Sequence, residues 1–419
     1  MADPSPAAPQ PPFGSDRIAH LLQAARAEFL THGYQHLSVD GLARASGVSK
    51  ETIYRYFSDK AAIFRAAVHG LEESFIARLP ALTDVSDPEH TLAACARAIH
   101  DCSVETDSAS FMWITISVAR EFPDLARALS ADAWEGMEPI RAYMEQVAVA
   151  HDSLTVPREL AGLFGALATE GPRYLMGWPA LSNDARDVAA LRTARLYLHG
   201  CLTPAAAQFD PGPSALPMRI TPRTWEPHLE ALLREARARF FAHGYRGANL
   251  EDIGATARVG RGTLYRHFGS KAGLFEAAML YAADELAARI PEPPTTGTLI
   301  ERLQAIALQI ATVLCSVDGI DLYCSVISEV RHAPRVAQQV YQRTREPFVA
   351  AIAAWLRAAS LHDIATADDI DWHAMQFLTL ATGGNRLLTH SANRDDTDFA
   401  QLAHTAVTLF QSGYLAADG

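Results

Sequence analysis

A short stretch of side chains from Lys50 to Phe57 has the composition of a surface that contacts nucleic acid. In the string KETIYRYF, Ile53 and Phe57 lie four residues apart, so a helix turns both toward a core and leaves Lys50, Tyr54 and Arg55 on its outer face. An arginine can donate two hydrogen bonds to one guanine, and tyrosine or threonine can reach phosphate or a thymine methyl. An isolated string of this kind is more often a solvated helix face. If it recurs in the chain, it indicates recognition of double-stranded DNA.

Motifs for catalysis, metals or cofactors do not occur in the sequence. HExxH, GxSxG, P-loop and GxGxxG patterns are missing, and the 16 histidines lack the spacing of metal ligands. We expect no cofactor, no metal and no catalytic residue, with an all-helical enzyme as the minor alternative. The five cysteines form no CxxC pair, which favours buried reduced thiols over a zinc site or a disulfide framework. A thiol sensor at Cys95 and Cys102, seven residues apart, stays open.

The string KETIYRYF recurs at a fixed offset. Sliding the chain by 211 residues lays Leu21–Val68 over Leu232–Met279 without a gap, and 19 of the 48 pairs are identical. The same offset places segment 111–129 over 322–340, and further on the Glu-Pro pair at 138–139 meets the pair at 346–347 after a small shift that belongs in loops. The whole unit is therefore duplicated. Because TIYRYF and TLYRHF appear at equivalent places, DNA recognition becomes the favoured interpretation.

Helical patterns precede each string. Apolar residues recur at helical spacing over 18–29 and again over 229–240. The glycine that follows each segment, Gly33 or Gly244, is expected to end this first helix.

Two short helices follow in the first copy. Ser38 can cap a second helix, Ser46 and Gly47 form a turn, and Ser49 can cap a third helix that begins at Lys50. Two short helices around a tight glycine turn predict a helix-turn-helix.

These strings resemble the recognition helices of the tetracycline-repressor (TetR) family. GVSKETIYRYFSDKAAIF and RGTLYRHFGSKAGLF carry the resemblance, and REFPDLARAL and HAPRVAQQV look like the regulatory domain of AefR-like members. The family implies an all-helical subunit whose body binds a small molecule and dimerises, so that two heads meet DNA. It implies base-facing positions at Lys50, Glu51, Arg55, Arg261, Gly262 and Arg266, and contacts to the DNA backbone from Thr52, Tyr54, Tyr56, Lys60, Thr263, Tyr265, His267 and Lys271.

The second head departs from the family pattern at two positions. Arg258 stands where the turn glycine is expected, and Gly260 stands where a serine would cap the recognition helix. An arginine in a left-handed turn costs on the order of 1 kcal/mol. The turn of the second head is therefore expected to be reshaped, and its DNA affinity can differ from that of the first.

We expect an all-α fold of two tandem helix-turn-helix heads, each followed by a helical-bundle regulatory domain, arranged as a pseudo-dimer. Prolines between the copies prevent a helix there and indicate an extended linker. The expected boundaries are a disordered arm at 1–15, a first head at 16–60, a first body at 61–202, the linker at 203–227, a second head at 228–271 and a second body at 272–419.

Charge is distributed unevenly along the 419 residues. The formal net charge is −12, yet residues 16–69 carry +2 and residues 227–280 carry +3, which leaves −17 for the rest. Acidic bodies repel phosphate and keep DNA at the mildly basic heads. The Pro- and Ala-rich start lacks the pattern of a secretory signal, and no run of 18 apolar residues occurs, so we expect a cytoplasmic protein without a membrane span.

A tandem chain can supply both halves of a two-fold DNA reader. Family members pair two identical heads on half-sites roughly 34–36 Å apart. Because the recognition faces of the two heads differ, we expect an intrachain pseudo-dimer on an imperfect palindrome, acting as a repressor that a small molecule releases. A homodimer with four heads is the alternative, and a regulator without an effector also stays open.

Candidates for contact with the small molecule are aromatic and polar residues of the bodies. An apolar pocket between helices would use such side chains, although most aromatics at helical spacing are core. The candidates are Trp113, Tyr174, Tyr323 and Asn385.

Overall fold

The computed structural model describes residues 15–105, 112–113, 115–116, 119, 122, 124–125, 138–151, 158–169, 173–202, 226–290, 294, 296–359, 367–384 and 398–416. All regular structure in these ranges is helical, in agreement with the all-α prediction. The expected arm, nearly all of the expected linker and Asn385 lie outside the described residues.

The first copy begins with a three-helix head and continues into a helical body. Its elements are α1 (Ser15–His36), α2 (Val39–Ser46), α3 (Lys50–Tyr56), α4 (Lys60–Ile76), α5 (Pro88–Val104), α8 (Glu138–Ala150), α9 (Arg158–Ala168), the 3₁₀ turn η1 (Tyr174–Met176) and α10 (Asn183–Leu202).

The second copy repeats this order. Its elements are α11 (Pro227–Gly247), α12 (Leu250–Thr256), α13 (Arg261–Phe268), α14 (Lys271–Ala288), α15 (Leu299–Leu314), α16 (Val317–Ser328), α17 (Pro334–Thr344), α18 (Glu346–Ala359), α19 (Ala367–Ala381) and α21 (Phe399–Ala416). Among the described residues no single helix is long and apolar enough to cross a bilayer, while α15 and α16 reach that length and composition only as a pair bent by 63°.

The first helices end differently from the expectation. Helix α1 continues through Gly33 to His36, because the glycine keeps a helical backbone there. Helix α11 is kinked at Gly244, whose φ of 67° is left-handed, and the chain resumes helical turns up to Gly247. The prediction that a glycine ends the helix was therefore wrong at Gly33, and at Gly244 the glycine bends the chain.

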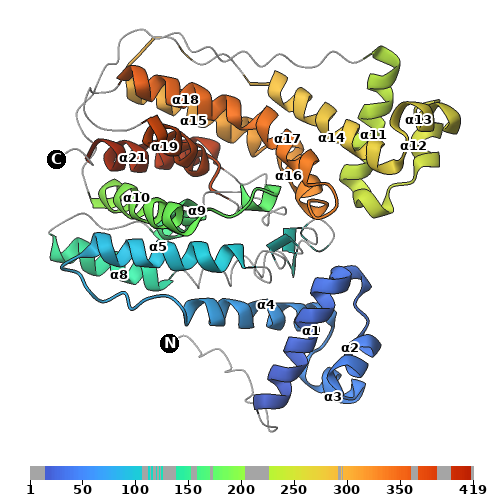
Figure 1. Ribbon diagram of the computed structural model, residues 1–419, viewed down its shortest axis with the longest axis horizontal. Coiled ribbons are helices and arrows are strands. Elements are labelled where there is room, and N and C mark those ends of the chain that lie inside the picture. The colour runs from blue at the N-terminus through green and yellow to red at the C-terminus, as the bar shows by residue number, and fades with distance from the viewer. Residues whose placement is uncertain are drawn as a thin grey trace, which may run out of the picture.

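The two bodies lie against each other in stacked helical layers (Figure 1). Helix α5 packs on α10, α10 packs on α21, and α21 packs on α15. Helix α9 contacts α19 beside them. The middle of the stack is therefore a four-helix arrangement to which each copy gives its last two helices. Both heads lie at the same side of the molecule, at the right in Figure 1.

Two glycines bring α10 and α21 into close contact. A Cβ atom added to Gly200 would lie 2.5 Å from the carbonyl oxygen of Leu409, and one added to Gly413 would lie 2.1 Å from that of Leu196. The two glycines are equivalent in the repeat, as are the two leucines, 213 residues apart in each case. The contact is therefore reciprocal, because the glycine of each copy packs against the equivalent leucine of the other copy.

The heads are tied to the rest of the molecule in different ways. The core of the second head, which includes Phe240 and Phe275, is continuous with the core of both bodies. The first head has a core of its own, to which the first body adds Leu125 and, partly buried, Phe122. Phe122 meets Tyr34 of the head edge to face at 4.8 Å.

Candidate DNA interface

Capping residues in the first head build the helix-turn-helix that the sequence predicts. The Ser38 side chain accepts from the backbone N–H of Gly41 at 3.0 Å, and the Ser49 side chain accepts from that of Thr52 at 3.3 Å. Gly47 ends α2 in a left-handed conformation with a φ of 64°. These three residues set where α3 begins and in which direction it leaves the turn.

Helix α3 is anchored on one face and open on the other. Ile53 is completely buried, whereas Lys50, Tyr54 and Arg55 are exposed. In the part of the chain that the structure describes, the Arg55 side chain makes no hydrogen bond or ion pair. An exposed guanidinium without a partner, on a helix fixed by a buried isoleucine, is available to a base edge or a phosphate.

Helix α13 of the second head presents the same face. Leu264 is buried, while Tyr265, Arg266 and His267 are exposed. The Arg266 side chain, like that of Arg55, makes no hydrogen bond or ion pair among the described residues. The structure thus places the two arginines at equivalent open positions.

The turn of the second head is not reshaped as expected, because Arg258 keeps the left-handed conformation that Gly47 has in the first head. Arg258 has a φ of 56° and is the only described residue other than glycine with a positive φ. Gly260 precedes α13 without a side-chain cap, whereas Asn249 caps α12 by accepting from the N–H of Glu251 at 2.8 Å. The second head therefore has the fold of the first with a less favourable turn and one cap fewer.

An ion pair joins the second and third helices in both heads. Lys50 Nζ lies 2.6 Å from Asp40 Oδ1, and Arg261 lies 3.0 Å from Glu251 Oε1. The hydrogen bond to Asp40 raises the pKa of Lys50. All four side chains are exposed, so the pairs are weak and can open.

The lysines that begin α4 and α14 stack on tyrosines of their own heads. Lys60 Nζ lies 4.6 Å from the centre of the Tyr34 ring, and Lys271 Nζ lies 5.1 Å from that of Tyr245. Lys271 also donates to the carbonyl of Arg246 at 3.1 Å, and burial lowers its pKa. Each ammonium thus helps to hold its head together.

The remaining predicted residues vary in exposure. Glu51 is exposed, and Gly262 faces open space. Thr52 and Thr263 are half-buried, with the Thr52 hydroxyl 2.9 Å from that of Ser49. The Tyr56 hydroxyl is enclosed and has no hydrogen-bond partner within the described ranges.

Comparison with known families identifies the heads and the second body. Residues 21–67 and 232–278 match the family described as bacterial regulatory proteins of the tetR family. Residues 301–416 match the AefR-like transcriptional repressor C-terminal domain. The chain belongs to the tetR family. Two matches to the head confirm the tandem duplication.

Relatives of this tetR-family chain match only part of it. It is 26% identical to the nucleoid occlusion factor SlmA of Alteromonas mediterranea over 122 residues, which are 29% of this chain and 55% of the relative. SlmA of Shewanella baltica is 26% identical over 121 residues, which are 29% and 54% of the two chains. The chain spans about half the length of the curated relatives it matches.

Solved structures also resemble part of the chain. The flavonoid-responsive regulator FrrA has 25% sequence identity and a TM-score of 0.40, and the match covers 46% of this chain and all of FrrA. A putative TetR-family regulator from Mesorhizobium loti has 21% identity and a TM-score of 0.37, with 43% and 94% covered.

The three described candidate ligand residues lie in different surroundings. Tyr323 is buried in the second body. Trp113 of the first body lies under Arg331 of the second, 5.0 Å from its ring centre to the guanidinium carbon. Tyr174 begins η1, and burial raises its pKa. Asn385 is outside the described residues. Sequence reasoning missed Arg345, which lies against Tyr323.

The cysteines are placed as the sequence predicted. Four of the five are buried and Cys201 is half-buried, and none of them is in a disulfide. Burial raises the pKa of Cys95 to about 12 and that of Cys102 above its usual value. Neither thiol is poised as a thiolate, which disfavours the sensor alternative.

Proposed function

We propose that one chain forms a complete two-headed repressor, an intrachain pseudo-dimer that binds one operator and is released from it by a small molecule. The observation that carries the proposal is the reciprocal contact of Gly200 with Leu409 and of Gly413 with Leu196. Reciprocal contacts between equivalent residues are the mark of a two-fold interface. Here both sides of that interface belong to the same chain.

The position of the heads supports this proposal. In Figure 1 they lie at one side of the stacked bodies, where one DNA duplex can meet both. Two-fold operators place their half-sites about one helical turn apart, roughly 34–36 Å. A chain with two heads on one side fits such a site without a second chain.

Differences between the recognition helices support an operator with unlike halves. The first head presents Lys50 and Glu51 where the second presents Arg261 and Gly262, while Arg55 and Arg266 stay equivalent in the repeat. A shared arginine favours a guanine common to both half-sites, and the other positions favour different neighbouring bases. We propose that the remaining contacts to DNA come from the predicted threonines and lysines, from His267 and from the exposed Tyr54 and Tyr265, whereas the enclosed hydroxyl of Tyr56 does not contribute.

The match of residues 301–416 to a repressor domain supports repression rather than activation. A body that responds to a small molecule is typical of the family. We further propose that the chain has no catalytic activity and works in the cytoplasm or on the nucleoid, where its DNA lies.

Molar mass in solution tests the arrangement. Light scattering coupled to size exclusion is measured for the full chain alone and for the chain saturated with DNA from upstream of its own coding sequence. A mass near 45.5 kDa with one chain per DNA site supports the proposal. Twice that mass with two chains per site would favour the four-headed homodimer. Absence of any DNA complex would contradict the function itself.

A further inference from the structure

The second body buries an arginine without a counter-charge. Arg345 follows α17 and is only 4% exposed. Its backbone N–H donates to the carbonyl of Tyr341 at 2.8 Å, but its Nε atom is enclosed without a hydrogen-bond partner. No carboxylate of the described residues lies within ion-pair distance of its guanidinium. A buried charge without a partner is strongly unfavourable, so its presence calls for an anion from elsewhere.

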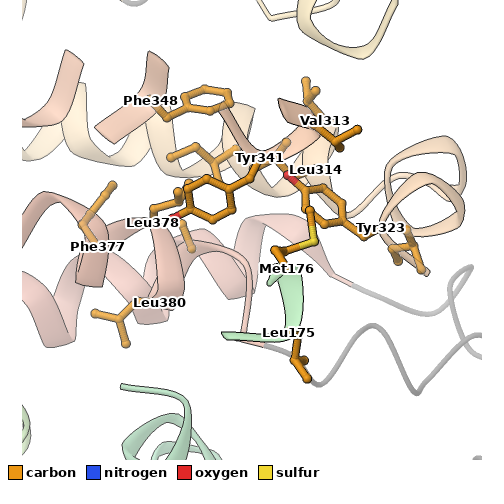
Figure 2. Close-up of a cluster of buried hydrophobic side chains, with 14 of the residues drawn as sticks. Leu175, Met176, Val313, Leu314, Tyr323, Tyr341, Phe348, Phe377, Leu378 and Leu380 are labelled. Carbon is orange, nitrogen blue, oxygen red and sulfur yellow. The ribbon is translucent and has the colours of Figure 1, made fainter. Parts of the chain in front are cut away.

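The surroundings of Arg345 are aromatic. Its guanidinium carbon lies 4.7 Å from the centre of the Tyr323 ring. The Tyr323 hydroxyl is hydrogen-bonded to that of Thr344. Tyr341 stands in the same cluster, where Figure 2 shows it beside Met176 and Tyr323. Burial raises the pKa of Tyr341 to about 12, so its hydroxyl stays protonated as a donor.

The first copy closes this cluster. The turn η1 contacts α16 and α17 of the second body, and its completely buried Met176 points toward Tyr323 (Figure 2). Gln338 donates to the carbonyl of Gly177 at 2.8 Å, and the ring of Trp178 lies 4.9 Å from that of Tyr341. One wall of the cluster thus comes from the opposite repeat.

The first body does not carry the same groups. The Glu-Pro pair that follows Arg345 at 346–347 is preceded in the first copy by Met137, and the residue equivalent to Tyr323 is Met112. In sequence, the first copy therefore carries methionine at both positions, so the arginine and the tyrosine are not shared by the two repeats. A buried charge that only one of the two repeats carries is typical of a binding group.

We propose that the second body binds a small organic anion, with its carboxylate or equivalent acid group paired with Arg345 and its apolar or aromatic skeleton packed among Tyr323, Tyr341 and Met176. The inference rests on the proposed function, since it assigns the chemical class of the effector and the copy that senses it. An anion held there contacts both repeats at once, because Met176 belongs to the first.

Benzoate, a minimal aromatic carboxylate, tests the proposal against its uncharged counterpart benzamide. A ligand of this size binds weakly, so we expect half-saturation on the order of 10 mM. The thermal midpoint of the full chain should rise with benzoate at constant ionic strength and stay unchanged with benzamide or chloride. The response should be lost in Arg345→Met, which introduces the residue of the first copy, and retained in Arg335→Met, which removes an exposed arginine of α17.

The variants also separate this proposal from the function on which it rests. Without ligand, Arg345→Met should raise the thermal midpoint, because it removes an unpaired buried charge, and DNA binding should persist. Equal shifts with benzoate and benzamide, no shift with benzoate, or an undiminished benzoate shift in Arg345→Met would overturn the anion site while DNA binding stands. Failure of the wild-type chain to bind DNA, with the Arg345-dependent benzoate shift intact, would overturn the regulatory function and leave the anion site.

Discussion

Arg55 and Arg266 leave their recognition helices with no partner in the described residues, and they are the groups most available to bases. We expect Arg55→Ala and Arg266→Ala each to weaken operator binding by about 1–3 kcal/mol and to relax base preference at one position of one half-site. Fluorescence anisotropy with a labelled operator measures both effects. Arg335→Ala, which removes an exposed arginine far from the heads in sequence, should bind as the wild type does. Wild-type affinity in both head variants would contradict the assignment of the recognition helices.

Arg258 has a conformation that costs free energy. We expect Arg258→Gly to stabilise the protein by up to about 1 kcal/mol. The left-handed backbone costs a residue with a side chain roughly 1–2 kcal/mol. Glycine removes this cost but offsets part of the gain, because it gives the unfolded chain more conformational entropy. Gly47→Ala, at the equivalent turn of the first head, should destabilise the protein instead. Urea unfolding measures both variants. A loss of stability in Arg258→Gly would mean that the arginine side chain makes a contact worth more than its strain.

Single residues were predictable where the physics is local. Ser38, Ser49 and Gly47 act within three or four residues of the helix ends that they define, and the strain at Arg258 follows from its place in the repeat. The partners of Lys50 and Lys271 were not predictable, because an ion pair with Asp40 or a stack on Tyr245 depends on how helices cross. The burial of Arg345 was not predictable for the same reason, since no local sequence pattern indicates that a charged side chain will be buried.

Helices α10 and α21 depend on the two glycines at their crossing. Alanine favours a helix over glycine by about 1 kcal/mol, so a loss of stability in Gly200→Ala or Gly413→Ala can come only from the clash with Leu409 or Leu196. We expect each to lower the free energy of unfolding by about 1–3 kcal/mol. Gly262→Ala should not lower the free energy of unfolding, because a Cβ atom at this helical position meets open space. Chemical denaturation measures the free energy of unfolding of the three variants. A value equal to that of the wild type in all of them would contradict the close contact between α10 and α21.

Helix α19 carries a half-buried histidine, His373, that makes the stability of the protein sensitive to acid. Burial, and then the charge of Arg192 from α10, lowers the pKa of His373 to about 4. The unfolded chain takes up the proton near pH 6.5 and the folded chain only near pH 4, so stability is complete above pH 6.5 and falls as the pH drops through this window. We expect a loss of about 2 kcal/mol between pH 7 and pH 5.

A variant without the imidazole isolates this contribution. His373→Phe should show a smaller loss between the same two pH values in urea unfolding. An unchanged pH dependence would assign the proton uptake to other groups.

At the scale of elements, the sequence predicted the helices of the heads better than the contacts between bodies. Helix α10 has apolar residues around much of its circumference, so its pattern does not say which neighbour it meets. The contact of η1, which holds Leu175 and Met176, with the other repeat could not be predicted from the sequence either, because a three-residue turn has no periodicity.

At the scale of the whole molecule, the duplication was predictable from the constant offset, and the family matches confirm it. The arrangement of the copies was only an expectation, because the same surfaces can pair within one chain or between two. The different attachment of the heads was not foreseen. The first head has a separate core, and we expect it to exchange its amide hydrogens before the second, whose core continues into the bodies. Simultaneous exchange would contradict that difference.

The proposed pairing of α10 with α21 within one chain also has a consequence for gene dosage. When a regulator must first assemble from two subunits that are mostly separate, the occupancy of its operator rises with the square of their concentration. A chain that carries both heads needs no assembly step, and occupancy then rises in direct proportion to the number of chains. A cell that holds only a few chains of the regulator, or one that has just divided, would keep the regulated promoter repressed, because no threshold concentration is needed for assembly.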